Sequence, residues 1–204
     1  IGFHQSTVHP FLARWWPTFG VPAASRVYVP LCGKSLDMVW LAERGYTIVG
    51  SELSAIAIRD FFASQRLEPL RSEQGGFVRH TAGPYTIIEG DALALTSDQT
   101  GPIDAVYDRA ALVALPPDMR AAYAASLARL TSPGVQVLLV AFEYPQEMKG
   151  GPPFSVEAAE IRELFEAAFT VREVERLDIL AESPKFAEIG IPALHETAVV
   201  LQRR

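Results

Sequence analysis

Short apolar runs and helical patterns alternate along most of this 204-residue chain. Runs rich in β-branched residues predict seven strands in the main alternation, at Arg26–Pro30, Thr47–Glu52, Tyr85–Glu89, Ile103–Tyr107, Val135–Phe142, Val171–Leu177 and Thr197–Gln202. An eighth run, Phe77–Thr81, is separated from Tyr85–Glu89 by Ala-Gly-Pro, which predicts a hairpin. Apolar residues at helical spacing predict four helices between them, at Ser35–Arg44, from Ser54 to about Gln65, at Pro117–Leu130 and around Ile161–Ala168. The polar, glycine-containing residues 66–76 predict a loop. Such alternation favours an α/β fold with helices on both faces of a mostly parallel sheet.

The last connection breaks the alternation. The segment from about Ala181 to Leu194 contains two prolines and a glycine, and no convincing helical pattern. Parallel strands need a crossover, usually a helix, whereas antiparallel strands do not. We therefore expect a Rossmann-like, seven-stranded sheet that is mostly parallel and ends in an antiparallel C-terminal hairpin. Residues 1–204 contain no internal repeat or linker, which predicts a single domain.

The first strand, its turn and the second strand have the layout of a nucleotide half-site. Val-Tyr-Val-Pro-Leu-Cys-Gly-Lys-Ser at 27–35 places Gly33 in the turn, and Glu52 ends the second strand 52 − 33 = 19 residues later. A glycine turn lets a ligand approach the backbone, and an acid at that strand end accepts hydrogen bonds from ribose hydroxyls. The alternative is an ordinary strand-turn-helix with an exposed glutamate.

The glycine pattern indicates which nucleotide fits. A dinucleotide fold uses three glycines to bring backbone amides to a pyrophosphate, and this turn has Gly33 alone. Lys34 and Ser35 resemble the end of a phosphate loop, but Tyr28 and Val29 stand where its first glycine would lie. A ribose site without backbone amides that bind a pyrophosphate suits S-adenosylmethionine better than NAD or ATP.

Two further acids follow predicted strands. Gly90-Asp91 follows the third strand of the alternation, where an acid accepts a hydrogen bond from an adenine amino group or simply caps a turn. Asp108-Arg109 follows the next strand, at the carboxyl edge where open α/β sheets bind ligands. Arg109 can grip a ligand carboxylate with two hydrogen bonds, or it can pair with Asp108 or Glu143.

Two segments outside the half-site are also candidates. Gly-Pro-Pro-Phe-Ser at 151–155 is rigid, and Phe154 offers an apolar wall for an acceptor pocket. The alternative is a stiff lead into the next helix, with Ser155 as its cap. His4 is a candidate general base, although a lone terminal histidine is more often a surface residue.

Composition excludes several classes of function. The net charge is −6 and the basic residues are scattered, so we expect no nucleic-acid partner. The single cysteine, Cys32, excludes an internal disulfide and a multi-cysteine metal site, and we interpret it as a packing residue rather than a nucleophile. No run approaches the roughly 20 apolar residues that a membrane-spanning helix requires.

Five segments together resemble the thiopurine S-methyltransferase family, in its bacterial form, within the class I S-adenosylmethionine-dependent methyltransferases. They are Gly-Phe-His-Gln at 2–5, Val-Pro-Leu-Cys-Gly-Lys-Ser-Leu-Asp-Met at 29–38, Gly-Ser-Glu-Leu-Ser at 50–54, Tyr-Asp-Arg-Ala-Ala-Leu at 107–112 and Gly-Pro-Pro-Phe-Ser at 151–155. The similarity runs through essentially the whole chain. The family also has a tryptophan-containing segment upstream of Phe-His that folds over the cofactor, and we expect this lid to be truncated or unseen here.

The resemblance implies S-adenosylmethionine as the methyl donor and places the site residues. It places Leu31 and Glu52, beside Gly33, at the methionine and ribose parts of the cofactor, and Asp91 and Ala92 at its adenine. It places Arg109 at the cofactor carboxylate or near the acceptor. It places Phe3 at the acceptor pocket, which Phe154 also borders.

The expected reaction is an in-line attack by a small aromatic or heterocyclic thiolate, or by a selenium or tellurium nucleophile, on the sulfonium methyl group. No catalytic acid, base or metal is expected. We expect the protein to be a cytoplasmic monomer. Two alternatives stay open, namely a non-catalytic S-adenosylmethionine-binding protein and a nicotinamide-dependent oxidoreductase.

Overall fold

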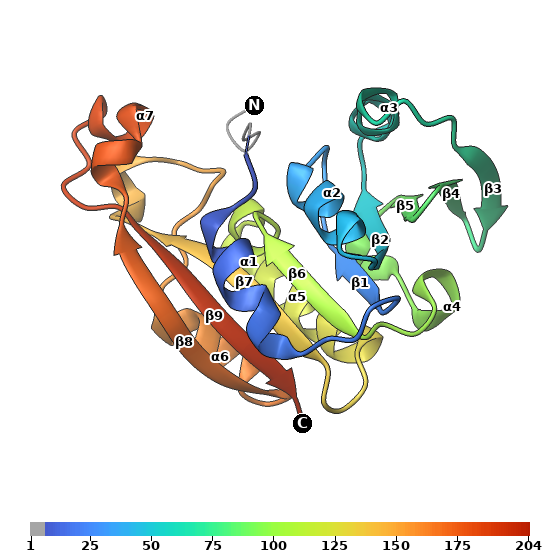
Figure 1. The fold of residues 1–204 in the computed structure, drawn as a ribbon. Coiled ribbons are helices and arrows are strands. Elements are labelled where there is room, and N and C mark those ends of the chain that lie inside the picture. The colour runs from blue at the N-terminus through green and yellow to red at the C-terminus, as the bar shows by residue number, and fades with distance from the viewer. Residues whose placement is uncertain (1–6) are drawn as a thin grey trace.

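The computed structural model describes residues 7–204, so Phe3 and His4 lie outside the described part of the chain. One sheet runs through it in the order β3-β4-β5-β2-β1-β6-β7-β9-β8 (Figure 1). Its strands are β1 (Arg26–Val29), β2 (Thr47–Glu52), β3 (Leu70–Gln74), β4 (Phe77–Ala82), β5 (Tyr85–Glu89), β6 (Ala105–Arg109), β7 (Gln136–Glu143), β8 (Phe169–Asp178) and β9 (His195–Arg203). The α-helices are α1 (Pro10–Trp15), α2 (Leu36–Glu43), α3 (Ala55–Ser64), α4 (Ser97–Thr100), α5 (Pro117–Leu130), α6 (Ala158–Phe165) and α7 (Pro184–Ala187).

The sheet confirms the expected fold class. The central strands β5, β2, β1, β6 and β7 are parallel. At one end, β9 pairs antiparallel with both β7 and β8, as the helix-poor final connection predicted. That connection does contain α7, but its four residues are too few for a crossover between parallel strands.

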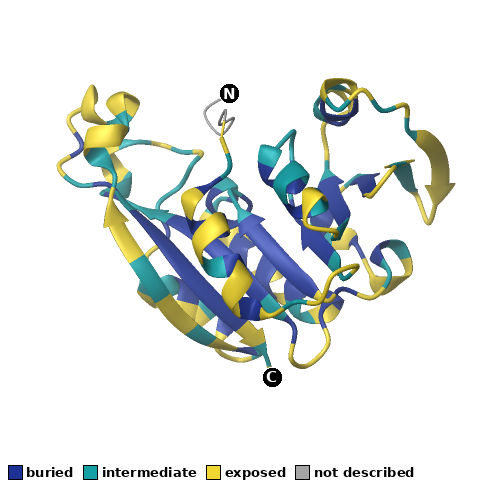
Figure 2. Ribbon diagram, in the orientation of Figure 1, coloured by how far each residue is buried: buried dark blue, intermediate teal, exposed yellow. Residues whose placement is uncertain are grey.

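The described sheet has nine strands instead of the seven expected. The predicted hairpin of β4 and β5 is present, and β3 adds to its outer side by antiparallel pairing with β4. The loop predicted for residues 66–76 therefore contains an edge strand. All five residues of β3 are exposed (Figure 2), so no alternation of apolar and polar positions marks it in the sequence.

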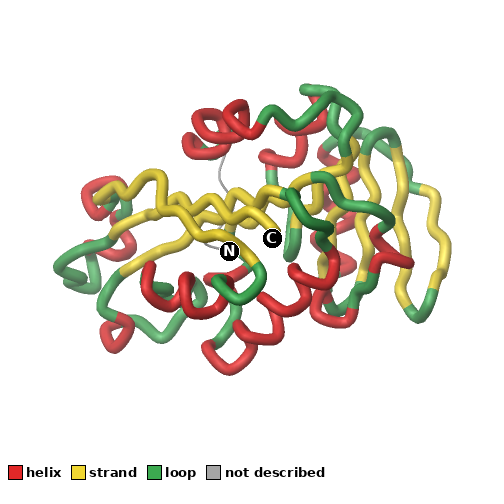
Figure 3. Tube along the Cα trace, turned by 90° about the horizontal axis from the view of Figure 1, so that it is seen from below, coloured by secondary structure: helices red, strands yellow, loops and turns green. Residues whose placement is uncertain are grey.

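Helices cover both faces of the sheet, as expected (Figure 3). Successive side chains of a strand point to opposite faces, and β1 illustrates the result. Val27 and Val29 pack in the core under α1, α2 and α3, whereas Tyr28 packs in the core under α5 and α6. The centre of the sheet is thus buried on both sides, which explains why its strands read as nearly continuous apolar runs.

The two helices that follow β1 and β2 begin and end where the sequence predicts. Ser35 and Ser54 cap α2 and α3, because their side chains accept hydrogen bonds from the amides of Asp37 and Ala57. Gly45 follows α2 with φ +85°, a left-handed conformation that suits glycine. Within residues 7–204, no helix is both long and apolar enough to cross a bilayer.

Candidate functional site

Two cavities open at the carboxyl ends of the parallel strands. The first, of about 340 Å³, lies among the turn after β1, the start of α3 and the segment after β6. The second, of about 190 Å³, lies among the ends of β2 and β5 and the start of α5. Leu31 and Glu52 line both cavities, so the two adjoin one another. This is the edge where open α/β sheets bind ligands.

Glu52 joins the turn after β1 to the turn after β2. Its Oε2 accepts a hydrogen bond from the Gly33 amide and its Oε1 accepts one from the Ser54 amide, both at 2.8 Å. A carboxylate oxygen has two lone-pair directions, so each retains capacity for a further donor. The side chain is only half-buried and can therefore meet a ligand from the cavity side.

The backbone of the turn after β1 adopts an uncommon conformation. Leu31 has φ +46° and Gly33 has φ +52°, and left-handed conformations of non-glycine residues are uncommon. Beneath the turn, a Cβ placed on Gly50 would lie 2.7 Å from the Cys32 sulfur, so only glycine at position 50 leaves room for this side chain. Strained backbone of this kind occurs at ligand sites, where the surrounding packing maintains it.

Cys32 is a buried, free thiol that also reaches the first cavity. Burial, reinforced by the nearby negative charge of Glu52, raises the pKa of the thiol well above its usual range. A neutral thiol is a poor nucleophile. This geometry supports the interpretation of Cys32 as a packing residue.

Asp108 and Arg109 point to different surroundings at the end of β6. Arg109 lines the first cavity, followed by Ala110 with φ +74°. Asp108 is fully buried instead, where it accepts hydrogen bonds from the amides of Ala111 and Leu112 and from the Tyr123 hydroxyl at 2.6 Å. Burial raises the pKa of Asp108 to about 6.

Asp91 and Ala92 line the second cavity. Asp91 also caps the short turn after β5, since its Oδ1 accepts a hydrogen bond from the Leu93 amide at 2.9 Å. The interpretation of Asp91 as a turn cap is therefore confirmed, and its adenine-binding role stays a prediction. Two exposed apolar side chains that the sequence analysis did not single out, Leu53 and Met119, also line this cavity.

The segment 151–155 lines neither cavity but contacts a neighbour of the wall of the first one. Phe154 is not among the residues that line either one. Its amide donates to the Val113 carbonyl at 2.6 Å, directly before Ala114 in the wall of the first cavity. The expectation that Ser155 caps the next helix is wrong, because α6 begins at Ala158 after Glu157, and the Ser155 hydroxyl accepts from the Tyr144 amide.

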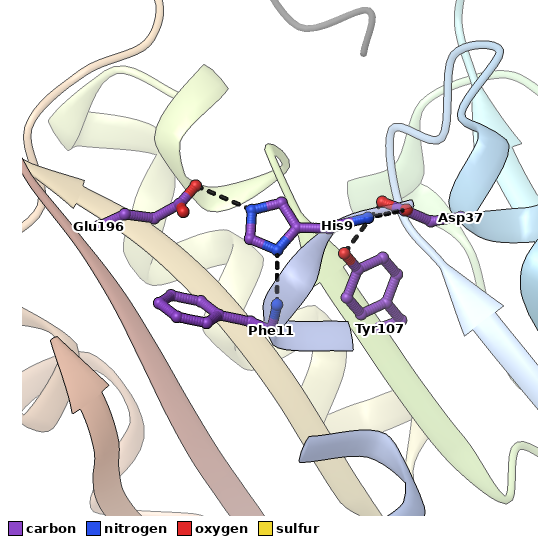
Figure 4. A network of polar contacts seen from close by, with 5 residues as sticks. All are labelled: His9, Phe11, Asp37, Tyr107 and Glu196. Atoms are coloured by element: carbon purple, nitrogen blue, oxygen red, sulfur yellow. Dashed lines mark hydrogen bonds and ion pairs between the residues drawn. The ribbon is translucent and has the colours of Figure 1, made fainter. Parts of the chain in front are cut away.

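A buried polar network joins the N-terminal region to the first cavity (Figure 4). The His9 ring donates from Nε2 to Glu196 at 2.9 Å, since its Nδ1 accepts from the Phe11 amide. The His9 amide and the Tyr107 hydroxyl donate to the two oxygens of Asp37. Asp37 lies in the first turn of α2, directly after the turn that lines the cavity, so the network fixes α1 against this turn.

The arrangement fits an elongated ligand with a sugar diol, an apolar ring and a negatively charged end. A carboxylate stands where the cavities meet, apolar side chains flank the second cavity, and a guanidinium stands in the wall of the first. Among residues 7–204, no group of three or more His, Cys, Asp or Glu side chains is placed to hold a metal ion.

Comparison with known proteins agrees with this geometry. Residues 1–204 match the family model described as thiopurine S-methyltransferase (TPMT). The thiopurine S-methyltransferases of Azotobacter vinelandii and Xanthomonas axonopodis pv. citri are 46% and 45% identical, over 100% of this chain and 94% and 93% of theirs.

Solved structures agree on the fold. A SAM-dependent methyltransferase from Methanosarcina mazei superposes with a TM-score of 0.67 at 15% identity, over 96% of this chain and 98% of that one. A TehB-like SAM-dependent methyltransferase from Corynebacterium glutamicum has a TM-score of 0.61 at 13% identity, over 94% of this chain and 86% of that one. These two structures confirm the expected fold class. The family match and the named relatives confirm the methyltransferase activity and S-adenosylmethionine as cofactor. The chain belongs to the thiopurine S-methyltransferase family.

Proposed function

We propose that this enzyme transfers a methyl group from S-adenosylmethionine to the sulfur of a small aromatic or heterocyclic thiol, with selenium and tellurium compounds as further acceptors. The observation that carries the proposal is the pair of adjoining cavities that share Leu31 and Glu52. The names of the relatives, which match over the whole chain, support sulfur as the receiving atom.

Each cavity has a proposed occupant. Asp91 and Ala92 form a wall for the adenine ring in the second cavity, which the apolar side chains of Leu53 and Met119 also line. Glu52 accepts hydrogen bonds from the ribose hydroxyls where the cavities meet.

The methionine part occupies the first cavity. Leu31 and Gly33 form the turn beside it. Arg109 binds the cofactor carboxylate, because a guanidinium matches a carboxylate with two parallel hydrogen bonds. Phe154 supports the acceptor side from behind, while Phe3, the other residue expected there, lies outside the described residues.

The chain's own contribution is alignment and removal of water. S-adenosylmethionine, when bound, supplies a methyl group already activated by a positively charged sulfur. The residues around the cavities therefore need only orient the acceptor in line with that group, which is worth up to roughly 7–11 kcal/mol in well-oriented reactions. Aromatic thiols that ionise near neutral pH need no strong base, and the buried, neutral thiol of Cys32 takes no covalent part.

Two measurements test the proposal. Calorimetric titration with S-adenosylhomocysteine and with NADH is expected to show binding of the first alone. Mass spectrometry after incubation with S-adenosylmethionine and a panel of thiols and selenols is expected to show products heavier by one methyl group, with aromatic thiols preferred. Tight binding of S-adenosylhomocysteine without methylation of any acceptor would favour a non-catalytic binding protein, and binding of NADH would revive the oxidoreductase alternative.

We also propose that the protein works as a cytoplasmic monomer with a single methyltransferase domain over 1–204. One feature supports the single domain, because one sheet contains every described strand. Light scattering after size exclusion and a single cooperative unfolding transition are the expected results, and cell fractionation tests the compartment.

A further inference from the structure

One segment separates the two cavities from the segment 151–155. It runs from the end of β6 to the first turn of α5. On one side, Ala114 lines the first cavity, and Leu115 and Met119 line the second. On its other side, the Val113 carbonyl accepts a hydrogen bond from the Phe154 amide at 2.6 Å. Residues 110–120 therefore touch both the cofactor site and the proposed acceptor side.

Arg120 ends this segment and is almost completely buried, with 2% of its side chain exposed. Its Nε donates to the Leu115 carbonyl at 3.1 Å and its Nη1 to the Glu160 carboxylate of α6 at 2.6 Å. Its guanidinium carbon lies 5.9 Å from the centre of the Phe154 ring, within range of a cation–π contact. One side chain thus joins a wall residue of the second cavity, a neighbouring helix and the segment 151–155.

The position of Arg120 is energetically unfavourable for a cation. Arg120 lies in the first turn of α5, where the positive end of the helix dipole disfavours positive charge. Its burial removes water, and no described residue accepts a hydrogen bond from Nη2. A buried charge with incomplete pairing contributes little net stability compared with an apolar side chain of similar size. Stability alone therefore gives little reason for an arginine here.

The far side of the segment 151–155 is held independently. The Tyr144 hydroxyl donates to the Pro153 carbonyl at 2.5 Å, and the Ser155 amide donates to the Gln146 side chain at 2.7 Å. These contacts fix the segment to the end of β7. On the side of α5, the Phe154 ring contacts Arg120 and the Phe154 amide contacts Val113.

We propose that Arg120 is a positioning residue that couples cofactor binding to acceptor binding, by linking the Leu115 wall of the second cavity to Phe154. The inference rests on the proposed function, because it assigns the segment 151–155 to the acceptor side. A ligand in the second cavity holds Leu115 in place. The Arg120 guanidinium, which donates a hydrogen bond to the Leu115 carbonyl, in turn holds the Phe154 ring. The acceptor then meets a preformed wall.

The test compares Arg120→Lys and Glu160→Gln with wild type and with two control variants on α6, Arg162→Lys and Glu163→Gln, whose side chains are exposed. Lysine keeps the charge but cannot replace the planar group that bonds Leu115 and Glu160 together and covers Phe154. We expect acceptor kcat/KM to fall roughly tenfold in Arg120→Lys while the Kd for S-adenosylhomocysteine changes less than about twofold. Glu160→Gln should change in the same direction by less, and the controls should match wild type.

A second readout needs no acceptor. Lys149 precedes the segment and donates to the Pro152 carbonyl at 3.3 Å, so we expect trypsin to cleave after it faster when the segment loosens. Saturating S-adenosylhomocysteine should slow this cleavage in wild type and should fail to slow it in Arg120→Lys. This loss of protection, in a variant that still binds the ligand, is the signature of lost coupling.

The outcomes separate the two ideas. If wild type binds no S-adenosylhomocysteine or methylates no thiol, the proposed function fails whatever the variants do. If wild type is active and Arg120→Lys keeps its acceptor kinetics and ligand-dependent protection, the coupling role is wrong. If Arg120→Lys loses acceptor kinetics, cofactor affinity and melting temperature in parallel, Arg120 is a structural residue, and the proposal is equally overturned.

Discussion

Replacing Glu52 with alanine is expected to weaken cofactor binding. The carboxylate lines both of them, at the point where the ribose is proposed to lie. The loss of a charge-assisted hydrogen bond to a ribose hydroxyl costs about 1.5–3 kcal/mol, which corresponds to a roughly ten- to hundredfold higher Kd.

The same substitution is also expected to lower stability. Glu52 accepts hydrogen bonds from the Gly33 and Ser54 amides, and alanine leaves both without this partner. Because the site is half-exposed, water replaces part of the loss, and we expect the free energy of unfolding to fall by only about 1–2 kcal/mol. Glu52→Gln keeps one carbonyl oxygen for one of the two amides, so its effects should be intermediate.

Calorimetry with a matched pair of ligands separates the two contributions. S-adenosylhomocysteine and its 2′,3′-dideoxy analogue differ only in the ribose hydroxyls, so Glu52→Ala should weaken the first ligand much more than the second. Glu89→Gln is the control, because Glu89 faces Glu52 in register on β5, accepts from His80 and lines neither cavity. Its Kd should stay within about twofold of wild type.

Two results would refute the reasoning. An equal loss of affinity for both ligands would mean that Glu52 shapes the turns but does not contact the ribose. An unchanged Kd for S-adenosylhomocysteine in a folded Glu52→Ala variant would remove this residue from the site altogether.

Three other substitutions give further tests. Cys32→Ser should retain most methyl transfer, because the buried thiol is neutral and in-line transfer needs no enzyme nucleophile; full loss of turnover with intact cofactor binding would point instead to a covalent intermediate. Arg109→Lys and Arg109→Ala should weaken S-adenosylhomocysteine more than 5′-methylthioadenosine, which lacks the carboxylate, and equal weakening of both ligands would contradict the carboxylate role. Asp108 keeps its proton in the folded state up to a pKa of about 6, compared with 3.8 as an ordinary carboxyl, so its contribution to stability is complete below pH 3.8 and falls as pH rises through 6, by about 3 kcal/mol in total. Urea unfolding should therefore show the stability difference between wild type and Asp108→Asn shrinking from pH 4 to pH 6, and a flat or rising difference would exclude a raised pKa.

The sequence alone predicted most of the secondary structure, because local periodicity encodes it. The bounds of β2, β5 and α5 match the predictions, and the caps at Ser35 and Ser54 lie where expected. The spacing from Gly33 to Glu52 placed both residues beside one cavity, since two parallel strands joined by one helix necessarily end at the same edge. The polar edge strand β3 and the short helix α1 were missed, because neither has an apolar pattern of its own that is long enough to be recognised.

Only the tertiary structure decided where the side chains point and which distant residues meet. Adjacent residues of a strand face opposite sides of the sheet, so Asp108 is buried against Tyr123 whereas Arg109 lines a cavity. The sequence had placed both residues together at the end of one strand. The contact of His9 with Glu196 joins residues 187 positions apart, and no local pattern specifies such a pairing. The periodicity of the sequence determines which residues are buried, and the alternation of strands and helices determines at which edge of the sheet each strand ends. The partner of a buried polar group depends instead on how whole elements pack.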